Sequence, residues 1–271
     1  MRTLFDTLGA ATRILVAFFV LHTGPALAQV PAAAEVVTGT EIISSATSDD
    51  GRWTLMASRH PDALTLLDAR RQPVRSFPLT TLDGHTRSRV AQVHDTGPRQ
   101  SFVVALQDIA ELWEISYNPQ AEPIFDGLVH DYRMGEALAT PGFLGVRRTP
   151  LDAPLHAFLL DPSGRIVIGV TPPNGSIPPT AQVIHLDVRR RIASFALPGS
   201  PDMASAVQIT RGGTALLGIP LQGSGCVTVV NMKTWQVLPS ATAPGRCVSV
   251  PEWIRAAGTT APRSAPDAGR Q

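Results

Sequence analysis

Short runs of alternating apolar and polar residues, separated by turn residues, recur from about residue 40 to residue 240. One unit contains such runs at residues 53–57, 64–68 and 74–77, with Asp- and Gly-containing turns beside them. Alternation places every second side chain on one face of a β-strand. The pattern therefore predicts antiparallel strands joined by short turns, and an all-β fold class.

The same order of runs and turns returns three more times. The copies comprise residues 90–93, 101–105 and 112–116, then 166–170, 183–187 and 192–195, then 214–219, 227–231 and 235–238. The residues that end equivalent runs, Asp68, Ser116, Asp187 and Asn231, are 48, 71 and 44 positions apart. A period of about 45 residues is typical of β-propeller blades. We predict a propeller of about four to five blades, incomplete or closed as a small ring, rather than a β-sandwich.

The long interval in this repeat contains an insertion, from about residue 126 to residue 154, which we expect to lie between two blades. His130, Asp131, Tyr132 and Arg133 follow one another within it. Imidazole can bind a metal or haem iron or transfer a proton, and guanidinium can bind a carboxylate. The alternative is that these side chains only hydrogen-bond loop carbonyls and fix a long connection.

The two ends of the chain lack the repeat. Arg2 and Arg13 precede an apolar run at residues 14–21, and Ala-Leu-Ala at residues 26–28 has the small-x-small pattern of a signal-peptidase site. The run is too short to cross a bilayer of about 30 Å as a helix. We expect an export signal at residues 1–28, a periplasmic propeller without a stable membrane span at residues 29–254, and a disordered tail at residues 255–271.

Composition narrows the classes of function and fold. Arg and Lys total 23 against 22 Asp and Glu, which argues against a nucleic-acid partner, because phosphate neutralisation needs a basic surface. The 24 prolines and 22 glycines argue against a helical bundle.

The chain has two cysteines, Cys226 and Cys247. Export would place them in an oxidising compartment, where they either form a disulfide or stay as two separate buried thiols. The sequence contains no C-x-x-C-H motif, so we expect no covalently attached c-type haem.

Several other residues have simpler interpretations. Trp53, Trp113 and Trp235 recur at strand positions and are expected to pack between blades. His85 and His94 are assigned to loops without metal-ligand spacing, and residues 189–191 are assigned to a solvated hairpin turn.

Five segments resemble NirF-type proteins, which are periplasmic relatives of the haem d1 domain of nitrite reductase. They are Ser48-Asp-Asp-Gly-Arg-Trp53, Ser101-Phe-Val-Val-Ala-Leu106, Glu114-Ile-Ser-Tyr-Asn-Pro119, Phe125-Asp-Gly-Leu-Val-His-Asp-Tyr-Arg-Met-Gly-Glu136 and Asn231-Met-Lys-Thr-Trp235. The resemblance implies a propeller that binds haem d1 or its tetrapyrrole precursor, non-covalently, in a central cavity. It also implies a role in haem d1 biosynthesis or assembly for dissimilatory nitrite reductase, with that enzyme or other haem d1 assembly proteins as partners.

The resemblance also assigns roles to individual residues. It makes His130 the candidate iron ligand, with Asp131 and Arg133 beside it on the rim. Arg147 and Arg148 are then candidates for the propionates, and His60 is a further candidate near the cofactor.

Two departures from the family favour an alternative function. Residues 199–205 lack the histidine that the family carries at this place. The family forms a ring of eight blades, and this chain is too short to form that number. The alternative is a propeller scaffold, or a degenerate paralogue, that binds a protein partner of the same pathway without catalysis.

Overall fold

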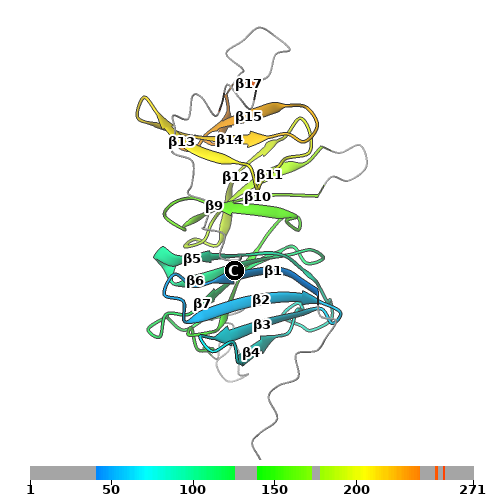
Figure 1. Ribbon diagram of the computed structural model, residues 1–271, viewed down its shortest axis with the longest axis vertical. Coiled ribbons are helices and arrows are strands. Elements are labelled where there is room, and N and C mark those ends of the chain that lie inside the picture. Colours follow the sequence, from blue (N-terminus) through cyan, green and yellow to red (C-terminus); the bar gives the residue numbers. More distant parts are fainter. Residues whose placement is uncertain (1–40, 126–138, 173–177, 239–247, 250–252, 254–271) are drawn as a thin grey trace, which may run out of the picture. The chain divides into compact units, whose positions relative to one another are not determined.

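The computed structural model describes residues 41–125, 139–172, 178–238, 248–249 and 253. Their strands form antiparallel sheets in sequence order (Figure 1). The first sheet contains β1 (Glu41–Thr47), β2 (Trp53–Arg59), β3 (Ala63–Asp68) and β4 (Pro73–Phe77). The second contains β5 (Val90–Thr96), β6 (Ser101–Leu106), β7 (Glu111–Ser116) and β8 (Val146–Pro150).

The later sheets repeat this order. The third contains β9 (Ala157–Leu160), β10 (Ile166–Val170), β11 (Thr180–His185) and β12 (Arg190–Ala196). The fourth contains β13 (Val207–Arg211), β14 (Thr214–Pro220), β15 (Cys226–Asn231) and β16 (Gln236–Val237), and β17 (Val248–Ser249) also pairs with β15. The all-β fold class is confirmed, and each of the four sequence repeats corresponds to one four-stranded unit of the propeller type.

Short polar side chains close the turns at the ends of strands. Asp68 Oδ1 accepts hydrogen bonds from the backbone amides of Arg70 and Gln72, at 2.8 and 2.9 Å. Asn231 Oδ1 accepts from the amides of Lys233 and Thr234 in the corresponding turn of the fourth sheet. These carboxylate and amide oxygens substitute for ladder partners where the chain reverses, which is why the repeat ends on such residues.

The first strand of each sheet is an edge strand with unpaired backbone groups. The neighbouring first strand satisfies some of these groups through side chains. Ser44 Oγ on β1 accepts from the Val93 amide on β5, and Gln92 Oε1 accepts from the Phe158 amide on β9, at 2.9 and 2.8 Å. Gln208 on β13 donates to the Leu160 carbonyl of β9 at 2.9 Å. The first strands of successive sheets therefore lie side by side.

Hydrophobic cores lie between successive sheets. Phe102 and Trp113 of the second sheet pack with Leu55 and Leu66 of the first. The opposite face of the second sheet packs on the third, and the other face of the third packs on the fourth. Among the described residues, no such core joins the fourth sheet to the first. Trp253 instead packs on the far face of the fourth sheet, beside Leu216 and Val227.

We predicted that the insertion lies between two blades, and this prediction is wrong. The residues that follow Ser116 rejoin the second sheet at β8, which pairs with β7 along its length, so the insertion lies within one sheet. His94 was also assigned wrongly to a loop, because it lies on β5 opposite Val103. Trp235 lies in the turn before β16 with a φ of 58° rather than on a strand.

Several predictions concern residues that the structure does not describe. They are the export signal at residues 1–28, the tail at residues 255–271, and Cys247. Cys226 is disulfide-bonded, but its pairing with Cys247 stays a prediction. Within the described parts of the chain, no helix is long and apolar enough to span a membrane.

Candidate functional site

The insertion leaves and re-enters the second sheet through a fixed stem. The backbones of Ile124 and Thr140 exchange two hydrogen bonds of 2.9 Å. Leu144, with a φ of 55°, donates its amide to the Ser116 carbonyl at 2.7 Å. A Cβ at Gly142 would lie 2.0 Å from the Glu122 carbonyl oxygen, so the close approach of the two stem segments requires glycine here. His130, Asp131 and Arg133 lie outside the described residues.

Arg147 and Arg148 are adjacent on β8 and point to opposite faces of the sheet, as neighbours on a strand must. Arg148 is held by three contacts on the side of the first sheet. Its Nη1 donates to Glu111 Oε2 at 2.8 Å and to the Thr80 carbonyl at 2.9 Å. Its guanidinium also lies 4.6 Å from the centre of the Trp113 ring. These contacts account for Arg148 as a packing residue between sheets.

Arg147 has a different environment on the side of the third sheet. It lines an open depression of about 170 Å³ at the base of the insertion stem, together with Ser116, Asn118 and Gly145. No described residue makes a hydrogen bond or an ion pair with its guanidinium. Within the described parts of the chain, no partner therefore competes with an anion for the Arg147 guanidinium.

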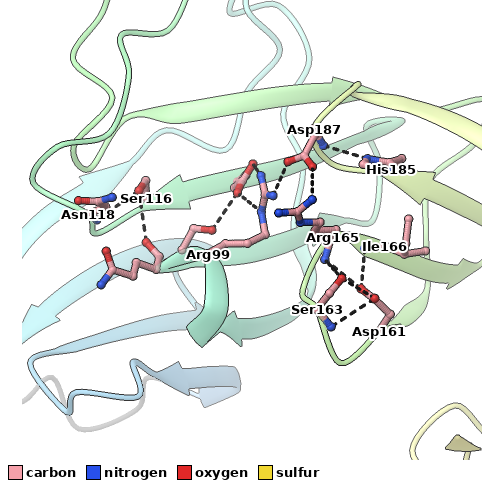
Figure 2. A network of polar contacts seen from close by, with 12 residues as sticks. Arg99, Ser116, Asn118, Asp161, Ser163, Arg165, Ile166, His185 and Asp187 are labelled. Carbon is pink, nitrogen blue, oxygen red and sulfur yellow. Dashed lines mark hydrogen bonds and ion pairs between the residues drawn. The ribbon is translucent and has the colours of Figure 1, made fainter.

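A polar network next to this depression joins the second sheet to the third (Figure 2). Arg99, at the end of the 3-10 turn η1 (Gly97–Arg99), donates from Nε and Nη2 to the two carboxylate oxygens of Glu114, at 2.8 and 3.2 Å. Its Nη1 donates to Asp187 in the turn after β11. Ser101 Oγ also donates to Glu114, at 2.9 Å.

The network is largely removed from solvent, since the side chains of Arg99 and Glu114 are 14% and 9% exposed. Burial opposes the charge on Arg99, but hydrogen bonds and charge from Glu114 and Asp187 outweigh it and raise the arginine pKa. The hydrogen bond from Arg99 is the main cause that lowers the pKa of Asp187. Removal of one partner would leave an uncompensated buried charge, so the network fixes the junction of the two sheets.

Two half-buried titratable groups lie on the inner strand β5. Burial is the main cause that raises the pKa of Asp95 to about 6, against the opposing effect of a 3.0 Å hydrogen bond donated by the Tyr117 hydroxyl. Burial also lowers the pKa of His94, whose Nε2 is buried beside the Phe158 ring and has no hydrogen-bond partner among the described residues. Both groups therefore favour the neutral form more than they would in water.

His60 lies at the other end of the strands from the insertion stem. The turn between β1 and β2 touches the turn between β5 and β6, because a Cβ at Gly97 would overlap the Asp49 carboxylate. The stem leaves β7 at this same end, where Ser116 pairs with Ser101. His60 follows β2 at the opposite end, with a φ of 60° and a cis bond to Pro61. The structure thus does not bring His60 together with Arg147 and Arg148.

Little in the sequence pattern indicates the Arg99 network. Arg99, Glu114 and Asp187 carry no motif, and 88 positions separate the first from the last. The only local signal was the loss of alternation where Glu114 interrupts the apolar residues of β7. Within the described residues, no group of three or more His, Cys, Asp or Glu side chains is placed to hold a metal ion.

Comparison with known proteins identifies the relatives of this chain. Residues 26–126 match the family described as Cytochrome D1 heme domain. The chain is 31% identical over 213 residues to dihydro-heme d1 dehydrogenase of Pseudomonas aeruginosa, covering 78% of this chain and 38% of that protein. It is 29% identical over 132 residues to protein NirF of the same organism, covering 48% of this chain and 28% of NirF.

A solved structure agrees with these sequence matches. The structure of dihydro-heme d1 dehydrogenase NirN in complex with DHE matches with a TM-score of 0.58 and 31% identity, over 72% of this chain and 36% of that one. The present chain thus spans less than two fifths of the length of each of these relatives. From these matches, the chain is homologous to NirN and NirF, which are haem d1 biosynthesis proteins.

Proposed function

We propose that this chain binds haem d1 or its tetrapyrrole precursor and acts in the biosynthesis or assembly of haem d1 for nitrite reductase. The observation that carries the proposal is the 31% identity with dihydro-heme d1 dehydrogenase over 78% of the chain. The match covers only 38% of that enzyme, so we propose binding and do not extend its dehydrogenase activity to this chain. The homology favours this function over a scaffold without a cofactor.

Bound haem d1 would supply a redox-active iron inside a conjugated macrocycle. In this proposal His130 would bind the iron, because neutral imidazole is a common ligand of haem iron. Asp131 and Arg133 adjoin it on the insertion, where a carboxylate can orient the imidazole and a guanidinium can bind a carboxylate of the ligand. Arg147 supplies a further guanidinium at the base of the same insertion, with no hydrogen bond or ion pair to any described residue.

The proposal includes a location and a mode of attachment. The pattern of basic, apolar and small residues at positions 1–28 supports export to the periplasm. The absence of a C-x-x-C-H motif from the sequence supports non-covalent binding, so acidified organic solvent should extract all of the tetrapyrrole from the protein. Nitrite reductase and other haem d1 assembly proteins are the protein partners that we propose.

An absorbance titration tests the proposal. We expect micromolar haem d1 to show a shifted Soret band in the presence of the purified chain. His130→Ala should move this band again, because it would remove a ligand of the iron, whereas His85→Ala, at an exposed loop histidine, should leave it unchanged. An unshifted band with the wild-type chain at micromolar haem d1 would exclude cofactor binding. A spectrum of His130→Ala identical to that of the wild type would remove His130 from the site.

A further inference from the structure

Glu114 and Arg147 face each other directly across the β7–β8 pair. Directly opposed residues of antiparallel strands have Cβ atoms about 5 Å apart, and opposite charges at such positions normally form an ion pair. Here they do not. The carboxylate of Glu114 and the guanidinium of Arg147 share no hydrogen bond or ion pair in the described part of the chain.

The reason is that another arginine already binds the carboxylate of Glu114. Arg99 binds both carboxylate oxygens of Glu114, and Ser101 adds a third hydrogen bond to Oε1. A fork of two N–H donors on two carboxylate oxygens is the strongest arrangement that the pair can adopt. Asp187 holds the remaining side of the Arg99 guanidinium, so Arg99 is fixed in this orientation from two sheets. Among the residues that the structure describes, Arg147 is therefore left without an ion pair, next to a carboxylate that already has its hydrogen bonds.

The depression beside Arg147 is bounded by a rigid floor. A Cβ at Gly145 would lie 2.2 Å from the Pro141 carbonyl, and the corresponding overlap at Gly142 involves Glu122. Ser116 and Asn118 line the depression, and so do Glu114 and Glu122. The depression has a volume of about 170 Å³, which is below the 300–1,000 Å³ that whole ligands require. The depression therefore fits a carboxylate-bearing arm or a small anion.

We propose that this depression is a carboxylate-binding site, in which Arg147 binds the carboxylate and Arg99 is the positioning residue that keeps Glu114 from neutralising Arg147. The carboxylate comes either from a side arm of the tetrapyrrole or from a free small dicarboxylate. The first source rests on the proposed function and the second does not. Because the depression is smaller than a macrocycle requires, an arm and not the macrocycle occupies this site.

The first experiment measures haem d1 affinity by absorbance in the full chain. With the tetrapyrrole as the source, Arg147→Gln weakens binding about tenfold, which is the usual effect of losing one charge-assisted contact. Arg189→Gln, at an exposed hairpin arginine that has no partner among the described residues, leaves the affinity within twofold.

The second experiment uses succinate as the probe, with sodium chloride at equal ionic strength as the control. With a free dicarboxylate as the source, 20 mM succinate raises the melting temperature of the wild-type chain by about 2–4 °C. Arg147→Gln abolishes this rise and leaves haem d1 affinity unchanged. The two experiments therefore distinguish the two sources.

The third experiment tests the role of Arg99. In Arg99→Met, Glu114 is free to pair with Arg147, so we expect the same loss of ligand binding as in Arg147→Gln although Arg147 is intact. Arg99→Met/Glu114→Gln removes the competing charge and restores binding to within about threefold of the wild type. The double variant also removes the uncompensated buried carboxylate, so it keeps the test valid if Arg99→Met alone unfolds.

Two results would overturn the inference. One is a folded Arg147→Gln variant that binds both haem d1 and succinate as the wild-type chain does. The other is an Arg99→Met variant that is folded and retains full binding, which would refute the role of Arg99. Failure of the proposed function gives a different result. The wild-type chain would then not bind haem d1, but succinate would still raise the melting temperature of the wild type and not that of Arg147→Gln.

Discussion

Two adjacent arginines show how burial and pairing separate residues that a sequence presents as equivalent. The guanidinium of Arg148 contacts Glu111, the Thr80 carbonyl and the Trp113 ring, so its charge is already paired within the fold. Arg147 faces the opposite side, next to Glu114, which Arg99 already binds. The resemblance to the NirF-type proteins made both of them candidates for propionates, and the contacts now favour Arg147 over Arg148.

At the same scale, Asp95 makes stability depend on pH. Its pKa is about 6 in the folded chain against 3.8 for an ordinary aspartate, mainly because of burial. A raised carboxyl pKa contributes stability that is fully present below the unfolded value and is lost as the pH rises through the folded value. The folded chain should therefore lose stability between about pH 4 and pH 6.5 on account of this group.

Asp95→Asn tests this dependence, because asparagine keeps an oxygen that accepts from the Tyr117 hydroxyl and has no charge to desolvate. At pH 7.5 we expect the variant to be more stable than the wild type by about 1 kcal/mol, after allowance for solvent screening of a half-exposed group. Near pH 4 the difference should vanish. Urea unfolding at both pH values measures it, with the exposed Asp62→Asn as the control. An equal effect at both pH values would contradict the assignment.

At the scale of the element, the insertion is positioned by its stem and by the strands that flank it. Ile124 and Thr140 close the stem, and Leu144 binds back to the end of β7. The sequence repeat predicted the flanking strands but not β8, because the insertion separates this strand from its partner by 29 residues. A pairing between distant segments is decided by tertiary contacts, which local periodicity does not record.

Gly142→Ala tests the stem. A Cβ there would overlap the Glu122 carbonyl at 2.0 Å, and backbone cannot move as the end of a side chain can. We expect a loss of about 2 kcal/mol, which corresponds to a fall of about 4–8 °C in melting temperature for a chain of this size. Gly199→Ala is the matched control, because its Cβ would meet only the Leu221 side chain at 3.9 Å. Similar melting temperatures for both variants would mean that the stem is not held as described.

At the scale of the whole molecule, stability depends on packing between successive sheets, since each core is shared by two of them. The far face of the fourth sheet is covered differently. Trp253 packs on Gly218, where a Cβ would lie 2.2 Å from the indole. Cys226, on the neighbouring strand β15, is disulfide-bonded, and β17 pairs beside it. This end of the described chain is therefore held by an indole and a covalent link.

The predicted pairing of Cys226 with Cys247 has a direct test. Intact-mass measurement of material from an oxidising compartment should show a gain of two mass units on reduction, and peptide mapping should link the two cysteines. Cys226→Ser should lower stability by about 3 kcal/mol, because the loop of about 20 residues is no longer closed. Two alkylatable thiols before reduction would contradict the pairing.

The local features of this protein can be read from its amino-acid sequence: most of the strands, the polar turns and the repeat of about 45 residues. These follow from alternation and turn chemistry, which act over a few neighbouring residues. The sequence pattern missed β8, β9 and β13. The edge strand β9, for example, is also held by side chains of the neighbouring first strands, because its backbone makes hydrogen bonds with Gln92 and Gln208. Packing of the sheets is what brings Arg99 to Glu114 and Asp187, leaves Arg147 without a partner among the described residues, and places His60 at the opposite end from the insertion stem. Charge pairing depends on distances in space between segments far apart in sequence, and the chain sets those distances only when its sheets pack together.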